Sequence, residues 1–277
     1  MSRNDPLSPP VALTIAGSDC SAGAGAQADL KVFRSFGVYG LTAITCVVAE
    51  TPREVGSVHP VPPSVVAEQV ALLLSSYPVA AIKTGMLFSR AHIEAVAAAM
   101  DGHPAPLVVD PVMMASTGDS LIERDAVSAY RSLLFPRATV ITPNIDEAAR
   151  LAGEEITTRE HAEASARRLF EKYGTAVVVK GGHLKTKRCH DFLCGENLAC
   201  WLDSERLDTP ASHGTGCTFA AAMAACLAHG EDLVDSFKRA NSFVFQALTR
   251  GFVWNDPEGR PIHALNQNAE KERRTVR

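Results

Sequence analysis

Apolar segments alternate with amphipathic segments along most of this chain, and this alternation limits the folds that it can adopt. The apolar segments are rich in β-branched residues, whereas the segments between them carry apolar residues at helical spacing. Buried strands that are joined by helices form a mostly parallel sheet covered on both faces, so we predict an α/β fold. The predicted strands are 11–16, 38–49, 79–85, 106–111, 138–144 and 175–182, and the predicted helices are 27–36, 64–74, 90–100, 123–134 and 159–173.

Two segments fall outside this alternation. Residues 184–207 lack helical spacing and are expected to add edge strands. Residues 266–277 are polar and charged, which is typical of a frayed tail. The chain has 277 residues and shows no internal repeat and no linker, so the sequence predicts a single domain over residues 1–265, followed by that tail.

The composition argues against several classes of protein. A net charge of -4, without a basic stripe interleaved with aromatic residues, gives no reason to expect nucleic acid as a partner. The apolar segment at 11–17 is too short for a signal-peptide core or a membrane span, so we expect no membrane contact and a cytoplasmic location. The seven cysteines are scattered and match neither a disulfide framework nor the spacing of zinc ligands.

Small and polar residues gather where the predicted strands end. In an open parallel sheet, ligands bind beyond the carboxyl ends of the strands. Turns alone would explain the glycine, proline, asparagine and aspartate there. They do not explain Lys83 and Lys180, because a lysine at the end of a buried strand needs an anion, a carbonyl or solvent. We therefore expect a ligand site formed by residues 17–19, 83–86, 110–113, 142–144 and 180–183.

Residues 212–228 read SHGTGCTFAAAMAACLA, a small and polar run that leads directly into an apolar helix. The first N–H groups of a helix have no partner within it, and the helix dipole adds partial positive charge there. Gly214, Thr215 and Gly216 leave those donors open, which predicts a cradle for a phosphate or a developing oxyanion. The alternative is a helix that begins close to a strand, with glycine chosen for space. Neither a Walker loop nor a dinucleotide-binding glycine motif occurs.

Cys217 follows these residues directly. A helix start is expected to lower the pKa of a thiol, which would make this cysteine reactive. His213 lies four residues before Cys217, so a cysteine–histidine hydrolase is a second interpretation. Adjacency in sequence is not what such pairs require, and this interpretation is the weaker of the two.

Six segments in this order resemble those of the hydroxymethylpyrimidine/phosphomethylpyrimidine kinases of thiamine biosynthesis, which belong to the ribokinase-like superfamily. The segments are ALTIAGSDCSAGAGAQADLKVFRSFGVYGLTAIT, KTGM, VVDPVM, TPNIDEA, VVVKGGHL and HGTGCT, and they span about residues 11–251. The resemblance implies a ribokinase-like three-layer sandwich without a β-lid, assembled as a homodimer. It also implies ATP-dependent phosphorylation of hydroxymethylpyrimidine and then of its monophosphate, with Mg²⁺ accompanying the ATP.

The same resemblance assigns roles to individual residues. Cys217 takes the position of a base, which could either accept the hydroxyl proton or position the hydroxyl group. For Asp29, which we interpret as an exposed acid on the first helix, the resemblance alone supports a role. The anion hole is assigned to Gly214, Thr215 and Gly216, the ATP contacts to Asn144, Glu147, Lys180 and Thr215, the magnesium site to Asp110 and Glu147, and the pyrimidine pocket to Gly17, Asp29, Glu50, Met86 and Val112.

Glu50 is a departure from the resembled family, which carries a glutamine at this position to read the aminopyrimidine edge. An amide accepts one hydrogen bond and donates another, whereas an ionised carboxylate only accepts. Glu50 therefore loses the bond to the ring nitrogen unless that nitrogen is protonated, in which case the contact becomes charge-assisted. This departure keeps a pyridoxal kinase open as an alternative function. A catalytically weak pyrimidine-binding protein is also possible, but a sensor does not need a complete set of phosphoryl-transfer residues.

Overall fold

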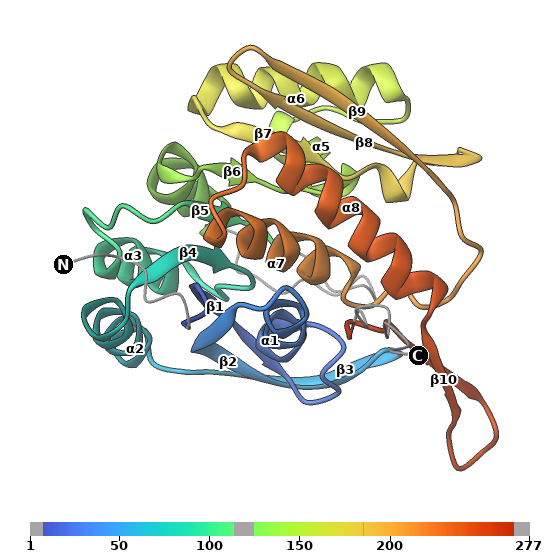
Figure 1. Cartoon of the computed structure of the whole chain (residues 1–277), viewed down its shortest axis with the longest axis horizontal. Coiled ribbons are helices and arrows are strands. Elements are labelled where there is room, and N and C mark those ends of the chain that lie inside the picture. Colours follow the sequence, from blue (N-terminus) through green and yellow to red (C-terminus); the bar gives the residue numbers. More distant parts are fainter. Residues whose placement is uncertain (1–7, 114–124, 185, 269–277) are drawn as a thin grey trace, which may run out of the picture.

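The computed structural model describes residues 8–113, 125–184 and 186–268. Within these ranges, nine strands form one sheet in the order β3-β2-β1-β4-β5-β6-β7-β8-β9 (Figure 1). The pairs from β2 through β1, β4, β5 and β6 to β7 are parallel, and the pairs at the two edges are antiparallel. The predicted mostly parallel sheet is therefore confirmed. The strands are β1 (Val11–Asp19), β2 (Tyr39–Thr51), β3 (Glu54–Pro60), β4 (Val79–Thr84), β5 (Leu107–Val109), β6 (Val140–Ile141), β7 (Ala176–Val179), β8 (Arg188–Gly195) and β9 (Leu198–Glu205).

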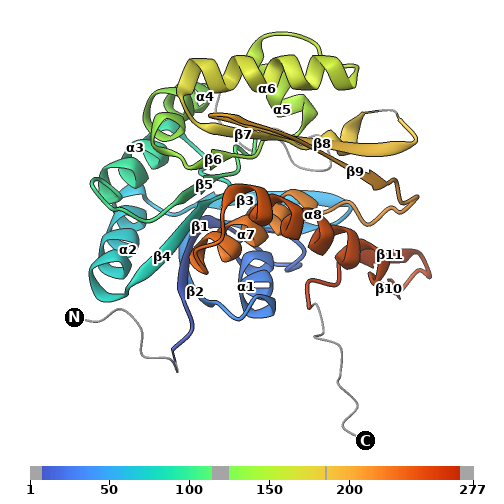
Figure 2. The ribbon, with the colours of Figure 1, turned by 45° about the horizontal axis from the view of Figure 1, so that its top comes forward.

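Helices cover both faces of this sheet (Figure 2). Side chains alternate along β1, so that Leu13 and Ile15 enter one core while Ala12 enters the other. The first core is closed by α2, α3, α4, α5 and α6, and the second by α1, α7 and α8. The helices are α1 (Gly25–Ser35), α2 (Pro63–Ser76), α3 (Arg90–Ala99), α4 (Ala126–Ala129), α5 (Ile145–Ala152), α6 (Arg159–Tyr173), α7 (Thr215–Ala228) and α8 (Leu233–Thr249).

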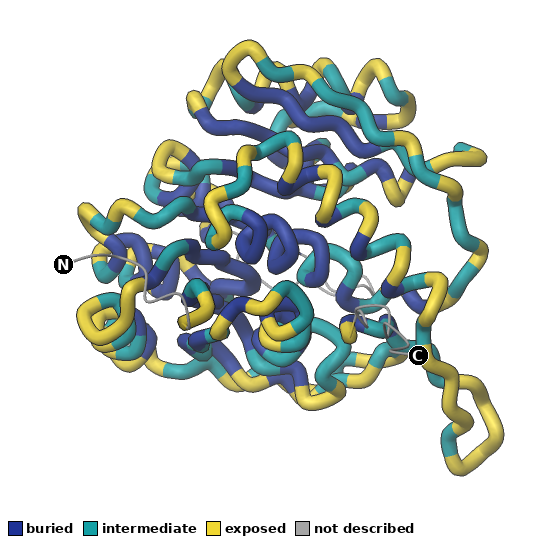
Figure 3. Tube along the Cα trace, viewed as in Figure 1, coloured by how far each residue is buried: buried dark blue, intermediate teal, exposed yellow. Residues whose placement is uncertain are grey.

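Helix α7 is the most deeply buried of these helices, because its sequence is apolar on every side. All residues from Thr218 to Cys226 are buried, and the middle of the helix appears dark blue in Figure 3, with intermediate residues at both ends. It packs between α1 and α8 and contacts β4 and β5. The prediction of an apolar helix held on all sides is confirmed. No helix in the described part of the chain has the length and hydropathy needed to span a membrane.

Every predicted strand is present, and the predicted edge strands correspond to β8 and β9. The prediction for 123–134 falls partly outside the described residues. From residue 125 onward the chain forms α4 and then a π-helical turn, Tyr130–Leu134. The sequence analysis missed β3, α5, α8 and a hairpin of β10 (Phe252–Asn255) and β11 (Pro261–Ala264). Both β3 and β10 are largely exposed, so neither has the apolar pattern that marks a buried strand.

The predicted frayed tail is wrong for its first three residues, 266–268. The backbone N–H of Asn266 donates to the carbonyl oxygen of Ala247 on α8. The Gln267 side chain is buried and donates to the carbonyl oxygen of Gly23 at 2.9 Å and to Thr218 Oγ1 at 3.0 Å. A polar sequence can pack in this way because each buried polar atom finds a partner. The rest of the predicted tail, 269–277, lies outside the described residues.

Candidate active site

A cleft of about 560 Å³ opens beyond the carboxyl ends of the parallel strands, where the sequence predicts a ligand site. It has a polar end, defined by Asp110, Asn144, Glu147 and Lys180, and an apolar end around Met86. All predicted site residues except Asp29 line this cleft. They are Gly17, Glu50, Met86, Asp110, Val112, Asn144, Glu147, Lys180, Gly214, Thr215, Gly216 and Cys217.

The start of α7 forms one wall of the cleft. Gly214 is the residue before the first helical turn, and its φ of 83° lies in the left-handed region. A Cβ atom at this position would lie 1.9 Å from the carbonyl oxygen of Gly23, so only glycine lets the two loops approach this closely. Gly214, Thr215 and Gly216 all line the cleft, and the first N–H groups of α7 start there. This arrangement fits the predicted cradle for an anion.

Lys180 and Asp110 form an ion pair at the polar end. Lys180 Nζ lies 2.9 Å from Asp110 Oδ1, which also accepts a hydrogen bond from Thr142 Oγ1 at 3.0 Å. Burial alone would lower the pKa of Lys180, but the negative charges of Asp110 and Glu147 outweigh it and raise that pKa above its usual value. A Cβ atom on Gly216 would lie 3.1 Å from Lys180 Nζ, so the ammonium group sits directly against the start of α7. Two sources of positive potential thus converge at one place.

Asn144 and Glu147 hold each other at the start of α5. Asn144 Oδ1 accepts from the N–H of Glu147, and Glu147 Oε2 accepts from the N–H of Asn144, both at 2.9 Å. This reciprocal pair is a capping box, the pattern that N-x-x-E predicts at a helix start. Glu147 Oε1 also faces the N–H of Met113 at 3.3 Å. Burial raises the pKa of Glu147 to about 7, although Lys180 lowers it.

Asp29 is wholly buried in α1, so the interpretation of it as an exposed acid is wrong. Its Oδ2 lies 2.7 Å from Lys83 Nζ and accepts a hydrogen bond from Thr14 Oγ1 at 2.6 Å. Burial alone would lower the pKa of Lys83, but the carboxylate of Asp29 outweighs it and the pKa is raised. Lys83 lines the cleft and Asp29 does not. Asp29 therefore lies beneath the pocket, as the counter-ion of the lysine that faces it.

Cys217 lines the cleft close to both lysines, but its thiol is not activated. Burial raises the pKa of Cys217 to about 11, with further increases from the negative charges of Asp29 and Asp110. Lys83 and a hydrogen bond from the N–H of Gly25 lower the pKa, but not enough to restore its ordinary value. The predicted low pKa is therefore wrong. His213 lies next to Asp19 and forms its ion pair there, which also weakens the hydrolase interpretation.

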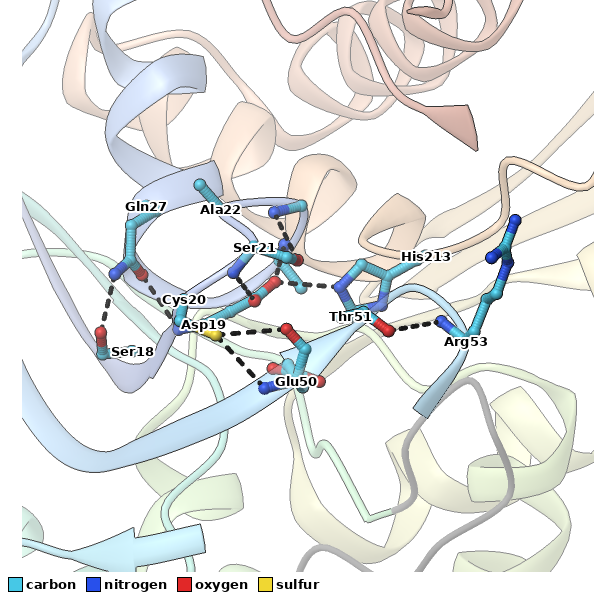
Figure 4. A network of polar contacts seen from close by, with 12 residues as sticks. Ser18, Asp19, Cys20, Ser21, Ala22, Gln27, Glu50, Thr51, Arg53 and His213 are labelled. Carbon is cyan, nitrogen blue, oxygen red and sulfur yellow. Dashed lines mark hydrogen bonds and ion pairs between the residues drawn. The ribbon is translucent and has the colours of Figure 1, made fainter. Parts of the chain in front are cut away.

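The apolar end is closed by a small cluster and by one acid. Cys46, Val48 and Met86 pack together, with Val112 against them, and Gly17 lies beside Cys46 and Met86. Glu50, near the end of β2, lines the same part of the cleft. The Cys20 thiol contacts the backbone of Glu50, with Sγ 3.3 Å from its N and 3.2 Å from its O (Figure 4). Glu50 therefore lies beside this apolar cluster.

Asp19 and His213 complete this region. Asp19 belongs to the predicted strand-end segment 17–19, whereas His213 was named only as a possible hydrolase partner of Cys217. Asp19 Oδ1 accepts from the N–H of Ser21 at 2.7 Å, and Oδ2 accepts from the N–H of Ala24 at 2.8 Å. His213 Nε2 lies 2.9 Å from the same Oδ2 (Figure 4). Burial alone would raise the pKa of Asp19, but the bond with His213 and these N–H groups hold it below its usual range.

Asp191 and Asn241 are two further cleft residues that the sequence analysis missed. The Asp191 carboxylate accepts from the N–H of Gly181 at 2.7 Å and from the Asn241 side chain at 2.8 Å. It therefore fixes the turn that directly follows Lys180. No motif marks either residue, because they come from β8 and α8 and meet only in the folded chain.

The cleft lies at the carboxyl edge of a parallel sheet, and its polar end holds Lys180, Asp110, Glu147 and an open helix end. These are the parts that position and stabilise a transferred phosphoryl group, so fold and site together define the class of α/β phosphotransferases. The comparison with known proteins agrees. The family model described as phosphomethylpyrimidine kinase matches residues 19–261, and the chain belongs to that family.

Curated relatives support this membership. The hydroxymethylpyrimidine/phosphomethylpyrimidine kinase of Rhizobium meliloti is 40% identical over 259 residues, which cover 93% of this chain and 97% of the relative. The kinase of the same description from Haemophilus influenzae is 41% identical and covers 86% and 90% of the two chains. A thiamine biosynthesis bifunctional protein of Geobacter sulfurreducens is 43% identical over 85% of this chain, which spans only 48% of that longer protein.

Solved structures give the same fold. A pyridoxal kinase of Bacillus subtilis in complex with ADP superposes with a TM-score of 0.86 at 36% identity, covering 95% of this chain and 98% of that one. A phosphomethylpyrimidine kinase from Clostridium difficile has a TM-score of 0.77 at 31% identity, covering 86% and 99%. The predicted ribokinase-like sandwich is confirmed by these neighbours.

Proposed function

We propose that this protein uses ATP to phosphorylate hydroxymethylpyrimidine and then its monophosphate, giving the diphosphate used to build thiamine. The observation that carries the proposal is the placement of Lys180, Asp110 and the start of α7 around one end of a cleft whose other end is apolar. The first end suits a chain of phosphates and the second a small ring. The names of the curated relatives support the same pair of substrates.

The reaction moves the γ-phosphoryl group of ATP to the hydroxymethyl oxygen of the substrate. The bond from phosphorus to the ADP oxygen breaks, a bond to the hydroxymethyl oxygen forms, and the hydroxyl proton is released. Lys180 and the first N–H groups of α7 stabilise the charge on the transferred group. The transition state is loose, so the hydroxyl needs little deprotonation before it attacks. Cys217, a neutral thiol at ordinary pH, therefore serves to orient the hydroxyl rather than to act as a base.

Mg²⁺ fits the polar end. Asp110 keeps Oδ2 free of the bonds that its Oδ1 makes to Lys180 and Thr142. Both oxygens of Glu147 already accept backbone hydrogen bonds. Mg²⁺ prefers carboxylate oxygens and keeps several of its waters. Asp110 would therefore bind the ion, and Glu147 would contact it through one of these waters. When bound, the ion would neutralise charge on the ATP phosphates.

Pyridoxal kinase activity is a second candidate function. The pyridoxal kinases of Bacillus subtilis and Staphylococcus aureus are similar over almost their whole length, at 36% and 34% identity. Pyridoxal is also a ring with a hydroxymethyl group, and Glu50 departs from the glutamine of the pyrimidine kinases. The two substrates would occupy the same apolar end of the cleft.

Turnover with ATP on hydroxymethylpyrimidine, on its monophosphate and on pyridoxal, measured side by side, tests the proposal. We expect phosphorylation of both pyrimidines, with pyridoxal turned over more slowly. Lys180→Met serves as the inactive control for contaminating kinases. If pyridoxal alone is phosphorylated, the second candidate replaces the first. If ATP binds but none of the three is phosphorylated, the protein is a binding protein and the proposal is wrong.

The homodimer implied by the resemblance and the cytoplasmic location expected from the sequence stay predictions. Light scattering of the purified chain gives the mass in solution, and about 59 kDa, twice the 29.5 kDa of one chain, is the result that we expect. Fractionation of the source cells tests the location.

A further inference from the structure

The carboxyl of Glu50 lies where its protonation state depends on the ligand that binds beside it. We propose that the occupied pocket holds one shared proton between the Glu50 carboxyl and a ring nitrogen of the substrate, and that this proton is taken up from solvent on binding. The inference rests on the proposed function, because it concerns the ring that binds at the apolar end of the cleft.

Asp19 is the first reason. One carboxylate oxygen each from Asp19 and Glu50, together with a ring nitrogen of His213, lie within 4.8 Å of one another. Both oxygens of Asp19 accept hydrogen bonds, three in all, so this carboxylate is stabilised in its ionised form. His213 Nε2 is hydrogen-bonded to Asp19 rather than to Glu50 (Figure 4). Among the described residues, no side chain or backbone group donates a hydrogen bond to the carboxyl of Glu50.

The charges that face Glu50 point the same way. The titratable groups on the surrounding elements are Asp19 at the end of β1, Cys20 after it, Cys46 on β2 and His213 before α7. Only His213 can be positive, and it is committed to Asp19. Burial and the negative charge of Asp19 raise the pKa of Glu50, and His213 only partly offsets them. A ring that fills the cleft excludes water and strengthens the repulsion between the two carboxylates.

A single proton on Glu50 or on the ring removes this repulsion and restores both hydrogen bonds to the ring edge. A neutral carboxylic acid has one O–H donor and one C=O acceptor, the same pattern as the amide of glutamine. It can donate to a ring nitrogen and accept from the amino group next to it. A protonated ring that faces an ionised Glu50 gives the same two bonds with the proton on the other side. Either way the complex contains one proton more than a glutamine pocket would need.

A metal ion at Asp19, Glu50 and His213 is a less suitable reading of the same cluster. A histidine binds a metal through an unprotonated nitrogen, and here Nε2 is engaged with the Asp19 carboxylate. Asp19 uses both of its oxygens for backbone and histidine donors. Only the carboxyl of Glu50 keeps its lone pairs free of protein partners, and one ligand does not make a metal site.

The inference predicts a pH dependence with a definite sign. Below the pKa of Glu50 in the free protein the carboxyl already carries its proton, and binding takes up none. Above that pKa the proton must come from solvent, so affinity for the pyrimidine falls by up to about tenfold per pH unit. Glu50→Gln supplies its donor permanently, so its affinity does not change with pH through this group.

Isothermal titration calorimetry of hydroxymethylpyrimidine into the full chain measures the protons directly. Binding heats are compared in buffers of different ionisation enthalpy, at about pH 6 and about pH 8.5. We expect uptake by the wild type to rise toward one proton at the higher pH, and Glu50→Gln to take up none at either. The matched control is Glu54→Gln, an exposed glutamate on β3 that should behave as the wild type.

Two outcomes overturn the inference. One is a wild type that takes up no proton at the higher pH, and the other is equal uptake by wild type and Glu50→Gln. Wild-type titration alone decides the first, even if the variant binds too weakly to measure. If hydroxymethylpyrimidine is neither bound nor phosphorylated, the proposed function fails instead. Turnover without proton uptake rejects only the role of Glu50.

Discussion

Two lysine–aspartate pairs lie close to the same cleft, and they differ in what surrounds them. Lys83 and Asp29 are 2.7 Å apart, and neither side chain has any exposed surface. Lys180 and Asp110 are 2.9 Å apart, with side-chain exposures of 14% and 3%. Each lysine is at or just after the end of a parallel strand, so sequence position alone does not separate them. The difference lies in access to the cleft.

Lys83 borders the cleft but its side chain has no exposed surface, whereas Lys180 is partly exposed to a space that a ligand can enter. Asp29 accepts from both Thr14 and Lys83 through one oxygen, and its other oxygen is buried without a partner among the described residues. Lys180 lies against the open start of α7, where a phosphate can take the place of Asp110 as its partner. The same two residue types therefore build a permanent support in the inner pair and an exchangeable contact in the outer pair.

Removal of the inner lysine tests the support role and has the largest expected effect. Lys83→Met leaves the buried carboxylate of Asp29 without its counter-ion, and we expect a loss of about 3–5 kcal/mol in the free energy of unfolding. Chemical denaturation measures it. Lys238→Met, which breaks the exposed pair with Asp235, is the control and should cost less than about 1 kcal/mol. If the two variants lose the same amount, the inner pair is not a structural support.

Removal of the outer lysine should affect catalysis instead. Lys180→Met takes away a side-chain donor that lies against the start of α7, and we expect kcat/KM to fall by about 10²–10³-fold. Steady-state kinetics with varied ATP measures the change. Lys172→Met, on the exposed face of α6, should leave kcat/KM unchanged. A Lys180 variant that keeps its activity but loses as much stability as Lys83→Met would erase the distinction between the pairs.

The first turn of α7 borders both pairs, and two glycines that flank the whole helix, Gly214 before it and Gly230 after it, sharpen the comparison. Gly230→Ala places a side chain at φ 82° with no atom within 4 Å, so we expect a loss of about 1–2 kcal/mol from backbone strain alone. Gly214→Ala has nearly the same φ but would overlap the carbonyl oxygen of Gly23. Its loss should be clearly larger and accompanied by lower activity. Thermal unfolding and turnover of both variants check this, and equal losses would contradict the close approach.

Cys217 lies near both lysines, and its replacement should have the smallest effect. A thiol with a pKa of about 11 is almost fully protonated at neutral pH, so it cannot contribute as a thiolate base. We expect Cys217→Ser to lower kcat by less than about tenfold, whereas loss of a general base costs about 10²–10⁴-fold. The pH–rate profile should keep its shape. A large loss, together with the disappearance of an ionisation near neutral pH, would show that the thiolate acts.

The sequence allows the outer pair to be predicted but not the inner one. Strand ends of a parallel sheet meet at one edge, so Asp110 and Lys180 could be placed together before the structure was known. Asp29 lies on a helix, and nothing local says whether its face meets solvent or a lysine 54 residues further on. The prediction of a low pKa for the Cys217 thiol was wrong for a related reason. Its pKa depends on burial and on distant carboxylates, not only on the helix that starts beside it.

The segments that were missed share a weak local signal. Helix α8 brings Asn241 to the cleft, but its contacts with α7 are visible only once both are folded. The polar stretch at 266–268 was assigned to a tail. The two acceptors that allow Gln267 to be buried come from the first loop and from α7, which are distant in sequence. Long-range satisfaction of polar groups leaves no periodic pattern in the chain.

The contact of Gln267 with Gly23 has a consequence for the biosynthesis of the protein. The two residues are 244 positions apart, so their hydrogen bond can form only after residue 267 has been synthesised. The loop that carries Gly23 also packs against Gly214, which starts the anion-binding helix. Strands and helices of the first half can assemble while translation continues. The loop beside the anion-binding helix therefore gains these contacts only after residue 267 has been synthesised.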